Sequence, residues 1–512
     1  MKGIASLKKA LCLLLAIVML IPAMVACDGD EGDGTGSAET TTTSTESKTD
    51  AATTIDPNDM HDLPADLNYG GKEVSFLAEF TDMQEDEFYL EDDYTPTGEL
   101  VPDAVYNRNK AVENQLNVKL VVKTRKGEYL NEVHKIDHSS GLAQYQIIAD
   151  RTTNKGVLII DNYYYNLKNF EHLNLDKNYW SSGFGDVVTF TKDAKQYLAT
   201  GVVAVSLYRM MFATIYNQKA LKTHGIEDPY QKIMDGEWTL DVQKAMIADT
   251  WQDKDGDGKK SEDDYFGFLS GVSTSMDPYL VASGVELIKK DPQTYNWNYD
   301  EDELSYLVEV ADKVQALTLD DNTFCLEKDK DHPSDRDIID KFAEGDAVMA
   351  TILFYGLEKG SGEINFDYGI APIPKYSTEQ KEYRTYVQDM VTSLGVNSAV
   401  KSEEDLEAIG ATLEALAYHS TKWIEEAYFQ KAMSSRFLKD PRSQAIVDIM
   451  YKSVAIDFCG MMSSCIEEFK LRDQLRPILS SDGSVTTLLA KNKTVITRAL
   501  SRTINKKANA LP

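Results

Sequence analysis

The sequence predicts an α/β protein whose folded part forms two lobes. Strand-like and helix-like segments alternate along the first part of the chain, which is typical of helices packed on a sheet. The same alternation begins again after residue 202. Residues 67–512, which follow a leader and a polar tether, are enough for two domains of ordinary size.

The first lobe is predicted to start at a strand over 72–79 (KEVSFLAE). A helix follows from Asp103, which suits an N-cap, and apolar residues between 105 and 116 recur on one helical face. Further strands are predicted at 118–123 and 145–150. A β-α-β-α-β order of this kind predicts a mostly parallel sheet covered by helices.

The second lobe is predicted to begin after a strand-like segment at 202–208 (VVAVSLY). Helical patterns follow around 238–251 and 302–317, with the strand YFGFL at 265–269 between them. The expected boundaries are 1–26 for a signal peptide, 27–66 for a tether, 67–203 with 393–430 for the first lobe, and 204–392 with 431–512 for the second.

The N-terminus has the pattern of a bacterial lipoprotein leader. Three lysines precede an apolar run that is shorter than the ~20 residues needed to span a membrane. The run ends in Met-Val-Ala-Cys, which resembles a lipobox and predicts lipidation of Cys27. The following residues, 28–64, are acidic and rich in Ser and Thr, so they favour a disordered tether. An ordinary secreted protein with a cysteine at this position is the alternative.

Charge and cysteine content exclude some classes of protein. The formal net charge is −30, which argues against a nucleic-acid partner because phosphate binding depends on clustered Lys and Arg. Cys325, Cys459 and Cys465 are the cysteines beyond the leader, and an odd number leaves at least one thiol free or intermolecular. A Cys459–Cys465 bridge is compatible with the spacing.

The stretch WQDKDGDGKKSEDDYFG at 251–267 has the spacing of an EF-hand calcium loop. Gly258 stands at position 6, where such loops need a sharp turn, and Asp replaces the usual Glu at position 12. The ligands that this spacing predicts are Asp253, Asp255, Asp257, the Lys259 carbonyl, Ser261 and Asp264. We expect a structural Ca²⁺ that braces the second lobe. An acidic surface loop without an ion is the alternative.

Catalytic motifs are missing from the sequence. There is no G-x-S-x-G elbow, phosphate-binding Gly-rich loop or H-E-x-x-H motif, so the sequence predicts a protein that is not an enzyme. His134 and His138 are four residues apart but lack the glutamate, and a solvated helix face is favoured over a zinc site. Abundant carboxylates leave a surface-anchored glycan-active enzyme as an alternative. A non-transport adhesion lipoprotein is another.

Five segments, in this order, resemble the family 1 extracellular solute-binding proteins of ABC importers, to which maltose-binding protein belongs. They are DAVYNRNKAVENQLNVKL from residue 103, YLATGVVAVSLYRMMFATIYNQKAL from 197, GEWTLD from 236, FAEGDAVMATILFYG from 342 and FDYGIAPIPK from 366. EALAYHS from 414 and KDPRSQAIVDIM from 439 depart from the maltose-binding pattern, which leaves the ligand class open.

The resemblance implies a periplasmic-binding-protein-like fold, with crossover hinge strands and a ligand cleft between the lobes. Together with the lipobox at Cys27, it implies a monomeric receptor that is lipid-anchored outside the cytoplasm. Such a receptor captures a carbohydrate and delivers it to membrane permease subunits driven by a cytoplasmic ATPase.

The resemblance also implies a set of ligand residues. Asp150 and Arg151 match an Asp-Arg pair at the lobe edge, although a structural ion pair fits equally well. Asp277 and Tyr279 match a Glu-Pro-Tyr element whose acid and ring contact sugar in relatives. Two further aromatics take the place of a stacking residue, with core packing as the alternative: Phe354 and Tyr355.

Overall fold

The structure is a computed structural model that describes residues 56–512, apart from 82, 85–86, 89–93, 327–335, 429–439, 441 and 464–469. The predicted signal peptide, the lipidation site Cys27 and most of the tether lie outside the described residues. Across the described part of the chain, no helix combines the length and the apolar character needed to cross a membrane.

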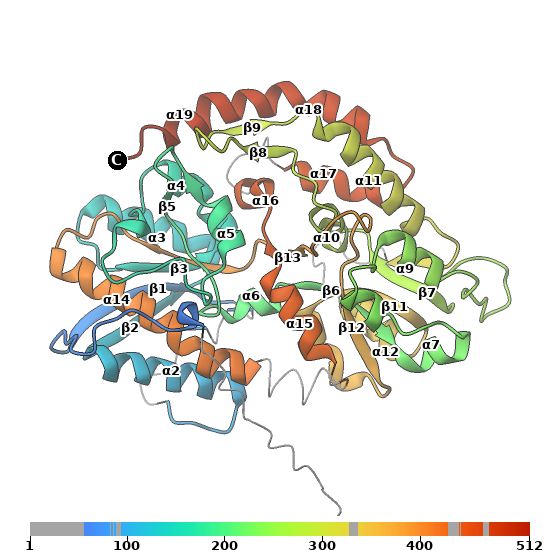
Figure 1. Cartoon of the computed structure of the whole chain (residues 1–512), viewed down its shortest axis with the longest axis horizontal. Coiled ribbons are helices and arrows are strands. Elements are labelled where there is room, and N and C mark those ends of the chain that lie inside the picture. The colour runs from blue at the N-terminus through green and yellow to red at the C-terminus, as the bar shows by residue number, and fades with distance from the viewer. Residues whose placement is uncertain are drawn as a thin grey trace, which may run out of the picture. The chain divides into compact units, whose positions relative to one another are not determined.

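The first lobe contains a four-stranded sheet with the order β14-β3-β1-β2 (Figure 1). Both β2 and β3 run parallel to β1, as predicted, and β14 runs antiparallel to β3. The strands are β1 (Lys72–Glu79), β2 (Val118–Arg125), β3 (Ile147–Arg151) and β14 (Thr392–Val396). The helices that pack on this sheet or on each other include α2 (Leu100–Leu116), α3 (Gly127–Ser140) and α14 (Glu403–Ser420).

The second lobe contains a five-stranded sheet with the order β10-β7-β11-β6-β12. The strand β6 is antiparallel to both of its neighbours, β11 and β12, and the other pairs are parallel. The strands are β6 (Phe212–Asn217), β7 (Phe266–Gly271), β10 (Thr323–Leu326), β11 (Ala347–Leu353) and β12 (Tyr368–Pro372). Their helices include α7 (Gln218–His224), α8 (Tyr230–Met234), α9 (Leu240–Met246), α11 (Glu303–Thr318), α12 (Arg336–Ala343) and α13 (Phe354–Gly360).

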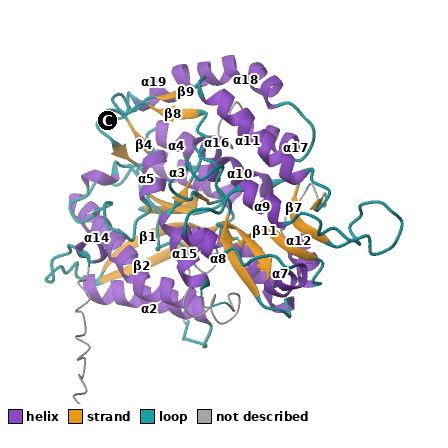
Figure 2. Ribbon diagram, turned by 45° about the vertical axis from the view of Figure 1, so that its right-hand side comes forward, coloured by secondary structure: helices purple, strands orange, loops and turns teal. Residues whose placement is uncertain are grey.

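Shorter elements connect and cover the two sheets (Figures 1 and 2). The strands among them are β4 (Thr189–Phe190), β5 (Lys195–Gln196), β8 (Ile288–Lys290), β9 (Trp297–Tyr299), β13 (Thr385–Tyr386) and β15 (Val454–Ala455). The helices are α4 (Gly156–Ile160), α5 (Ser182–Val187), α6 (Val205–Arg209), α10 (Asp277–Ala282), α15 (Ser443–Lys452), α16 (Phe458–Ser463), α17 (Leu471–Leu479), α18 (Val485–Ala499) and α19 (Asn505–Ala508). Two sheets with their own helices confirm the predicted two-lobed α/β class.

Two neighbouring segments carry the chain between the sheets. Single antiparallel bridges join Ala199 to Leu394 and Met211 to Val387, so the outgoing and returning segments lie side by side. The strand predicted at 202–208 is wrong, because this segment forms a turn and the helix α6. Every residue in it is buried, and a continuous apolar run does not distinguish a strand from a buried helix.

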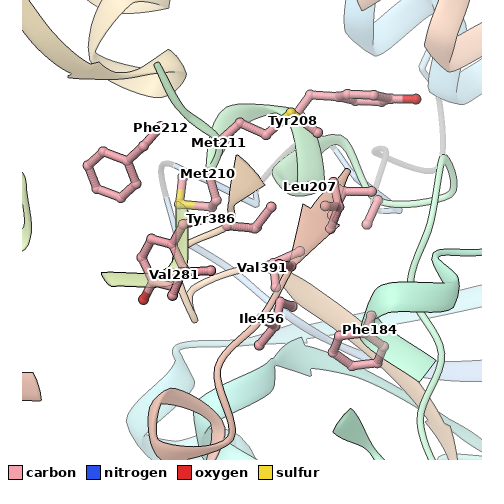
Figure 3. Packing of buried hydrophobic residues seen from close by; sticks show 14 of the residues in the cluster. Phe184, Leu207, Tyr208, Met210, Met211, Phe212, Val281, Tyr386, Val391 and Ile456 are labelled. Atoms are coloured by element: carbon pink, nitrogen blue, oxygen red, sulfur yellow. The ribbon is translucent and has the colours of Figure 1, made fainter. Parts of the chain in front are cut away.

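The apolar core continues through these crossing segments. Phe184 of α5, Leu207 of α6 and Val281 of α10 are each at most 6% exposed, and Val391 on the returning segment is fully buried. Figure 3 shows these side chains gathered around the crossing with Tyr386 and Ile456. The lobes are therefore joined by a packed connection as well as by the chain itself.

Candidate functional site

The carboxyl ends of β1 and β3 place three ionisable side chains together, at the edge where parallel sheets usually bind ligands. The Arg151 Nε donates to both carboxylate oxygens of Glu79, at 2.8 and 3.0 Å. Asp150 is fully buried beside this pair, and burial together with the Glu79 carboxylate raises its pKa well above the usual range. Arg151 is thus paired with Glu79, and Asp150 is buried beside the pair, while a ligand role for the two predicted residues stays a prediction.

Asp277, the first residue of α10, is held by two arginines of α17. The Arg476 Nε and Nη2 donate to its two carboxylate oxygens at 2.7 and 2.6 Å. The Arg472 Nη1 lies 3.6 Å from one of these oxygens. A carboxylate that already faces a guanidinium at both oxygens has little capacity left for a ligand hydroxyl in this arrangement.

The returning crossing segment connects these two groups of charges. The Arg472 Nη2 donates to Asp389 at 2.6 Å, and the Arg151 Nη1 contacts the sulfur of the next residue, Met390, at 3.3 Å. We call the whole set the charged cluster, and it comprises Glu79, Asp150, Arg151, Asp277, Asp389, Arg472 and Arg476. The structure therefore brings three of the predicted ligand residues from both lobes into one network.

The three predicted aromatic residues lie in the second lobe, and two of them face its interior. Tyr279 has no exposed surface, and its hydroxyl is 2.6 Å from the Thr351 hydroxyl. Phe354 is 1% exposed at the start of α13. Tyr355 is half-buried, with the Lys359 ammonium 5.3 Å from its ring centroid. Stacking of a ligand on these rings stays a prediction.

A cavity of about 1020 Å³ lies between segments of the two lobes. Its wall includes α5 and the β4–β5 hairpin from the first lobe, and the end of α10 and the β8–β9 hairpin from the second. Residues 380–384 and 452–458 complete it. This volume suits a small ligand. None of the six predicted ligand residues lines the cavity.

Aromatic and polar groups meet in the wall of this cavity. Trp297 stacks on Phe458 with ring centroids 4.2 Å apart, and the Lys290 ammonium lies 5.6 Å from the Trp297 ring. The indole Nε1 of Trp297 is buried without a hydrogen-bond partner among the described residues, and so is the Nε of Arg384. Both Trp297 and Arg384 line the cavity, so its wall combines aromatic surface with polar side chains, as small-molecule sites usually do.

The residues of this cavity wall were not predicted from the sequence. The signal that could have revealed it is the segment IKKDPQTYNWNY, where two short strand-like runs flank a turn with Asp-Pro. In the structure it forms the β8–β9 hairpin, with Lys290 opposite Trp297. The side chain of Asn505 fixes the hairpin by bonding the backbone N–H and carbonyl of Trp297, each at 2.8 Å.

The predicted calcium loop places three carboxylates together at the surface. Side-chain oxygens of Asp253, Asp255 and Asp257 all lie within 4.8 Å of one another. Gly258 has φ +74°, the left-handed conformation that position 6 of such a loop requires. The backbone N–H of Asp257 lowers the pKa of Asp255, but desolvation and the neighbouring Asp257 and Asp253 carboxylates raise it. The net shift of this pKa is upward. This group of oxygen donors fits a hard cation.

The last predicted ligand of the loop has other contacts. Asp264 is buried, and its carboxylate accepts the backbone N–H groups of Lys254 and Ser261 at 2.9 and 3.0 Å. The Trp251 Nε1 donates to the same carboxylate at 3.4 Å, so Asp264 already serves as a hydrogen-bond acceptor, and its role as a metal ligand stays a prediction. The Lys341 ammonium bonds the Asp264 carbonyl at 2.8 Å and so connects the loop to α12.

Comparison with known proteins identifies the fold. No family model and no curated protein matches the sequence. Among solved structures, a cyclo/maltodextrin-binding protein complexed with maltotetraose is similar with a TM-score of 0.53 and 12% identity, over 85% of this chain and 98% of that one. The cyclic α-maltosyl-1,6-maltose binding protein from Arthrobacter globiformis gives 0.52 and 14%, over 86% and 100%.

A family 1 extracellular solute-binding protein from Bifidobacterium longum subsp. infantis is also similar, with a TM-score of 0.50 and 16% identity, over 86% of this chain and 100% of that one. The chain therefore has the two-lobed fold of the extracellular solute-binding proteins. The resemblance noted in the sequence is confirmed at the level of the fold.

Proposed function

We propose that this chain is the solute-binding receptor of an ABC importer and that its ligand is a carbohydrate. The observation that carries the proposal is a cavity of ligand size with walls from both lobes, in a fold shared with a cyclo/maltodextrin-binding protein and a cyclic α-maltosyl-1,6-maltose binding protein. Separation of the lobes about the crossing segments would admit a small molecule, and closure would bury it without chemistry.

The same proposal places the receptor outside the cytoplasm, held to the membrane by lipid at Cys27. From there it would pass its ligand to permease subunits that a cytoplasmic ATPase drives. The structural relatives named above are binding proteins, which favours a receptor over the glycan-active enzyme that the sequence left open.

A structural Ca²⁺ belongs to the proposal as well. It would be held by the oxygens of Asp253, Asp255, Asp257 and Asp264, together with the Lys259 carbonyl and Ser261. The ion would screen the mutual repulsion of the carboxylates and so stabilise the loop that follows α9. Contacts from this loop to α12 and to Asp346 support a bracing role in the second lobe.

The ligand assignment is tested by calorimetry and thermal-shift measurements with purified protein and a panel of neutral oligosaccharides that includes maltotetraose. We expect one or more to bind and to raise the melting temperature. Trp297→Ala should weaken that binding by about 1–3 kcal/mol, the cost of losing a buried aromatic contact. Trp297→Phe should keep most of the affinity because a ring remains.

Trp423→Ala is the matched control, since Trp423 is only half-buried and does not line the cavity. It should bind with the affinity of the wild type. Equal losses in Trp297→Ala and Trp423→Ala would remove the cavity as the site. Release of reducing sugar from the oligosaccharides by the purified protein would show that the chain is an enzyme and contradict the receptor function.

A further inference from the structure

The C-terminal segment, residues 483–512, differs in charge from the rest of the protein. It contains no Asp or Glu, whereas the whole chain has 83 acidic residues and a net charge of −30. Its cations are Lys491, Lys493, Arg498, Arg502, Lys506 and Lys507. Because these six charges are all positive, the remainder of the chain has a formal net charge of about −36 by subtraction.

This segment is an amphipathic helix that lies at the edge of the molecule. It runs through α18 and a π-helical turn (Leu500–Ile504) into α19, and both ribbon views place α18 along the outer edge (Figures 1 and 2). Its inner face is apolar, with side chains at most 2% exposed: Leu489, Ile496, Leu500 and Ile504. The opposite face is therefore open to solvent.

Four of the six cations form a stripe on that outer face. Lys493 and Lys507 pair with Glu301 and Asp161, at 2.7 and 2.6 Å. The other four are exposed and have no ion-pair partner among the described residues, and at about 100° per residue they fall within roughly 80° of arc. We call them the basic stripe: Lys491, Arg498, Arg502 and Lys506.

We propose that the basic stripe docks on a membrane surface that contains anionic lipid. The stripe extends over about 22 Å along the helix, at 1.5 Å per residue, which spans several headgroups. Each Lys or Arg held close to such a surface strengthens binding about fivefold, whereas the acidic remainder is repelled. The stripe is thus the face that an anionic bilayer would select.

Two further features of the protein suit an anionic membrane as the partner. Val495 is 45% exposed between the cations, where a small apolar side chain can enter the headgroup region. The proposed lipid at Cys27 would keep the folded lobes close to a membrane through the chain of residues 27–55. The docking proposal rests on the proposed function in one respect only, the high local concentration that a lipid at Cys27 would give. The charge pattern itself does not depend on any bound sugar.

Vesicle co-sedimentation tests the assignment. The purified chain is mixed with vesicles of equal parts phosphatidylglycerol and phosphatidylcholine, or of phosphatidylcholine alone. The stripe variant carries K491Q, R498Q, R502Q and K506Q. A control of equal charge change replaces four exposed cations outside the segment: Lys123, Arg125, Lys126 and Lys222, each by Gln. All chains are otherwise identical, so any contribution of the N-terminus to binding cancels.

We expect the wild type to prefer the anionic vesicles and the stripe variant to lose that preference, by about tenfold or more in partition coefficient. The control should lose far less, because distant surface charges are screened beyond about 10 Å at moderate salt. Rising salt should weaken the wild type and barely affect the stripe variant. Both variants should melt close to the wild type, since exposed substitutions change stability little.

Equal losses in the two variants, or equal binding to both kinds of vesicle, would overturn the proposal. It would also be overturned if only vesicles carrying the permease captured the wild type and lost the stripe variant, because the partner would then be an acidic protein surface. Oligosaccharide affinity is measured on the same samples. An unchanged affinity beside absent vesicle binding would reject the docking surface and leave the receptor function intact.

Discussion

One buried histidine, His134, should contribute a loss of stability to this protein in mild acid. His134 of α3 has no exposed surface, and neither of its ring nitrogens has a hydrogen-bond partner among the described residues. Its ring lies against those of Tyr163 and Tyr164, with centroids 5.6 and 5.1 Å away. Burial, followed by the charges of Lys155 and His138, lowers the pKa of His134 to about 3. The solvated helix face expected at this position is therefore wrong for His134.

The sign and size of the effect follow from linkage. In the unfolded chain His134 titrates near 6.5, so below that pH the unfolded state binds a proton that the folded state does not. Stability is then unaffected above about pH 6.5 and decreases steadily as the pH falls toward about 3. At about pH 5, roughly 1.5 units below the unfolded-state pKa, the free energy of unfolding is lower by ~2 kcal/mol, since each unit corresponds to about 1.36 kcal/mol.

The substitution His134→Phe isolates this contribution, because phenylalanine keeps a ring in the same apolar space and cannot take up a proton. Urea unfolding of both proteins at about pH 7.5 and about pH 5 gives four free energies of unfolding. The wild type should lose ~2 kcal/mol more than the variant between the two pH values. At the higher pH the variant should be at least as stable, because an unsatisfied polar group has been removed. Equal losses in the two proteins would refute the assignment of a depressed pKa to His134.

Two other predictions concern the calcium loop and the N-terminus. Chelator should lower the melting temperature of the wild type and added Ca²⁺ should restore it, since an ion at a hundred times its dissociation constant stabilises by about 2.7 kcal/mol. Asp255→Ala should melt low and respond to neither, with its oligosaccharide affinity unchanged, and a chelator-insensitive wild type would remove the ion. Cys27→Ser should release the protein from the membrane fraction of expressing cells. Full retention of a variant that no longer incorporates labelled lipid would contradict a single anchor.

Much of the first lobe could be predicted because local pattern and tertiary environment agree there. The segment KEVSFLAE was expected as a strand over 72–79, and it is β1 with those bounds. The segment 202–208 was misassigned for the opposite reason. It is enclosed on all sides between the lobes, and the Ser206 N–H bonds the Glu87 carboxylate at 2.5 Å instead of joining a sheet ladder. The segment is buried because the two lobes pack around it, and a local sequence pattern carries no information about that packing.

The site was harder to predict because its pairings join distant parts of the chain. Asp277 could be recognised as a polar residue at the start of a helix, but its partner Arg476 is 199 positions away. Nothing in the spacing around either residue indicates that the two meet. The same difficulty applies to Tyr279, because a shift of one position along a helix decides whether a ring faces the cavity or the core. Local motifs therefore located the segment that forms α10, whose end lines the cavity, but not the β8–β9 hairpin, and the direction of each side chain depended on packing between elements.

Capture of a ligand by the proposed receptor requires the lobes to separate, and the structure indicates which contacts resist that movement least. The crossing segments are packed in a continuous apolar core and are fitted to act as the hinge. On the C-terminal side, α18 packs on α11 of the second lobe while α19 contacts α4 of the first. There the Lys507–Asp161 pair and the bond from Lys195 to the Pro512 carbonyl, at 2.6 Å each, are exposed. Exposed ion pairs of this kind contribute about 0–1 kcal/mol. These two polar contacts would therefore add little resistance to an opening movement of the proposed receptor.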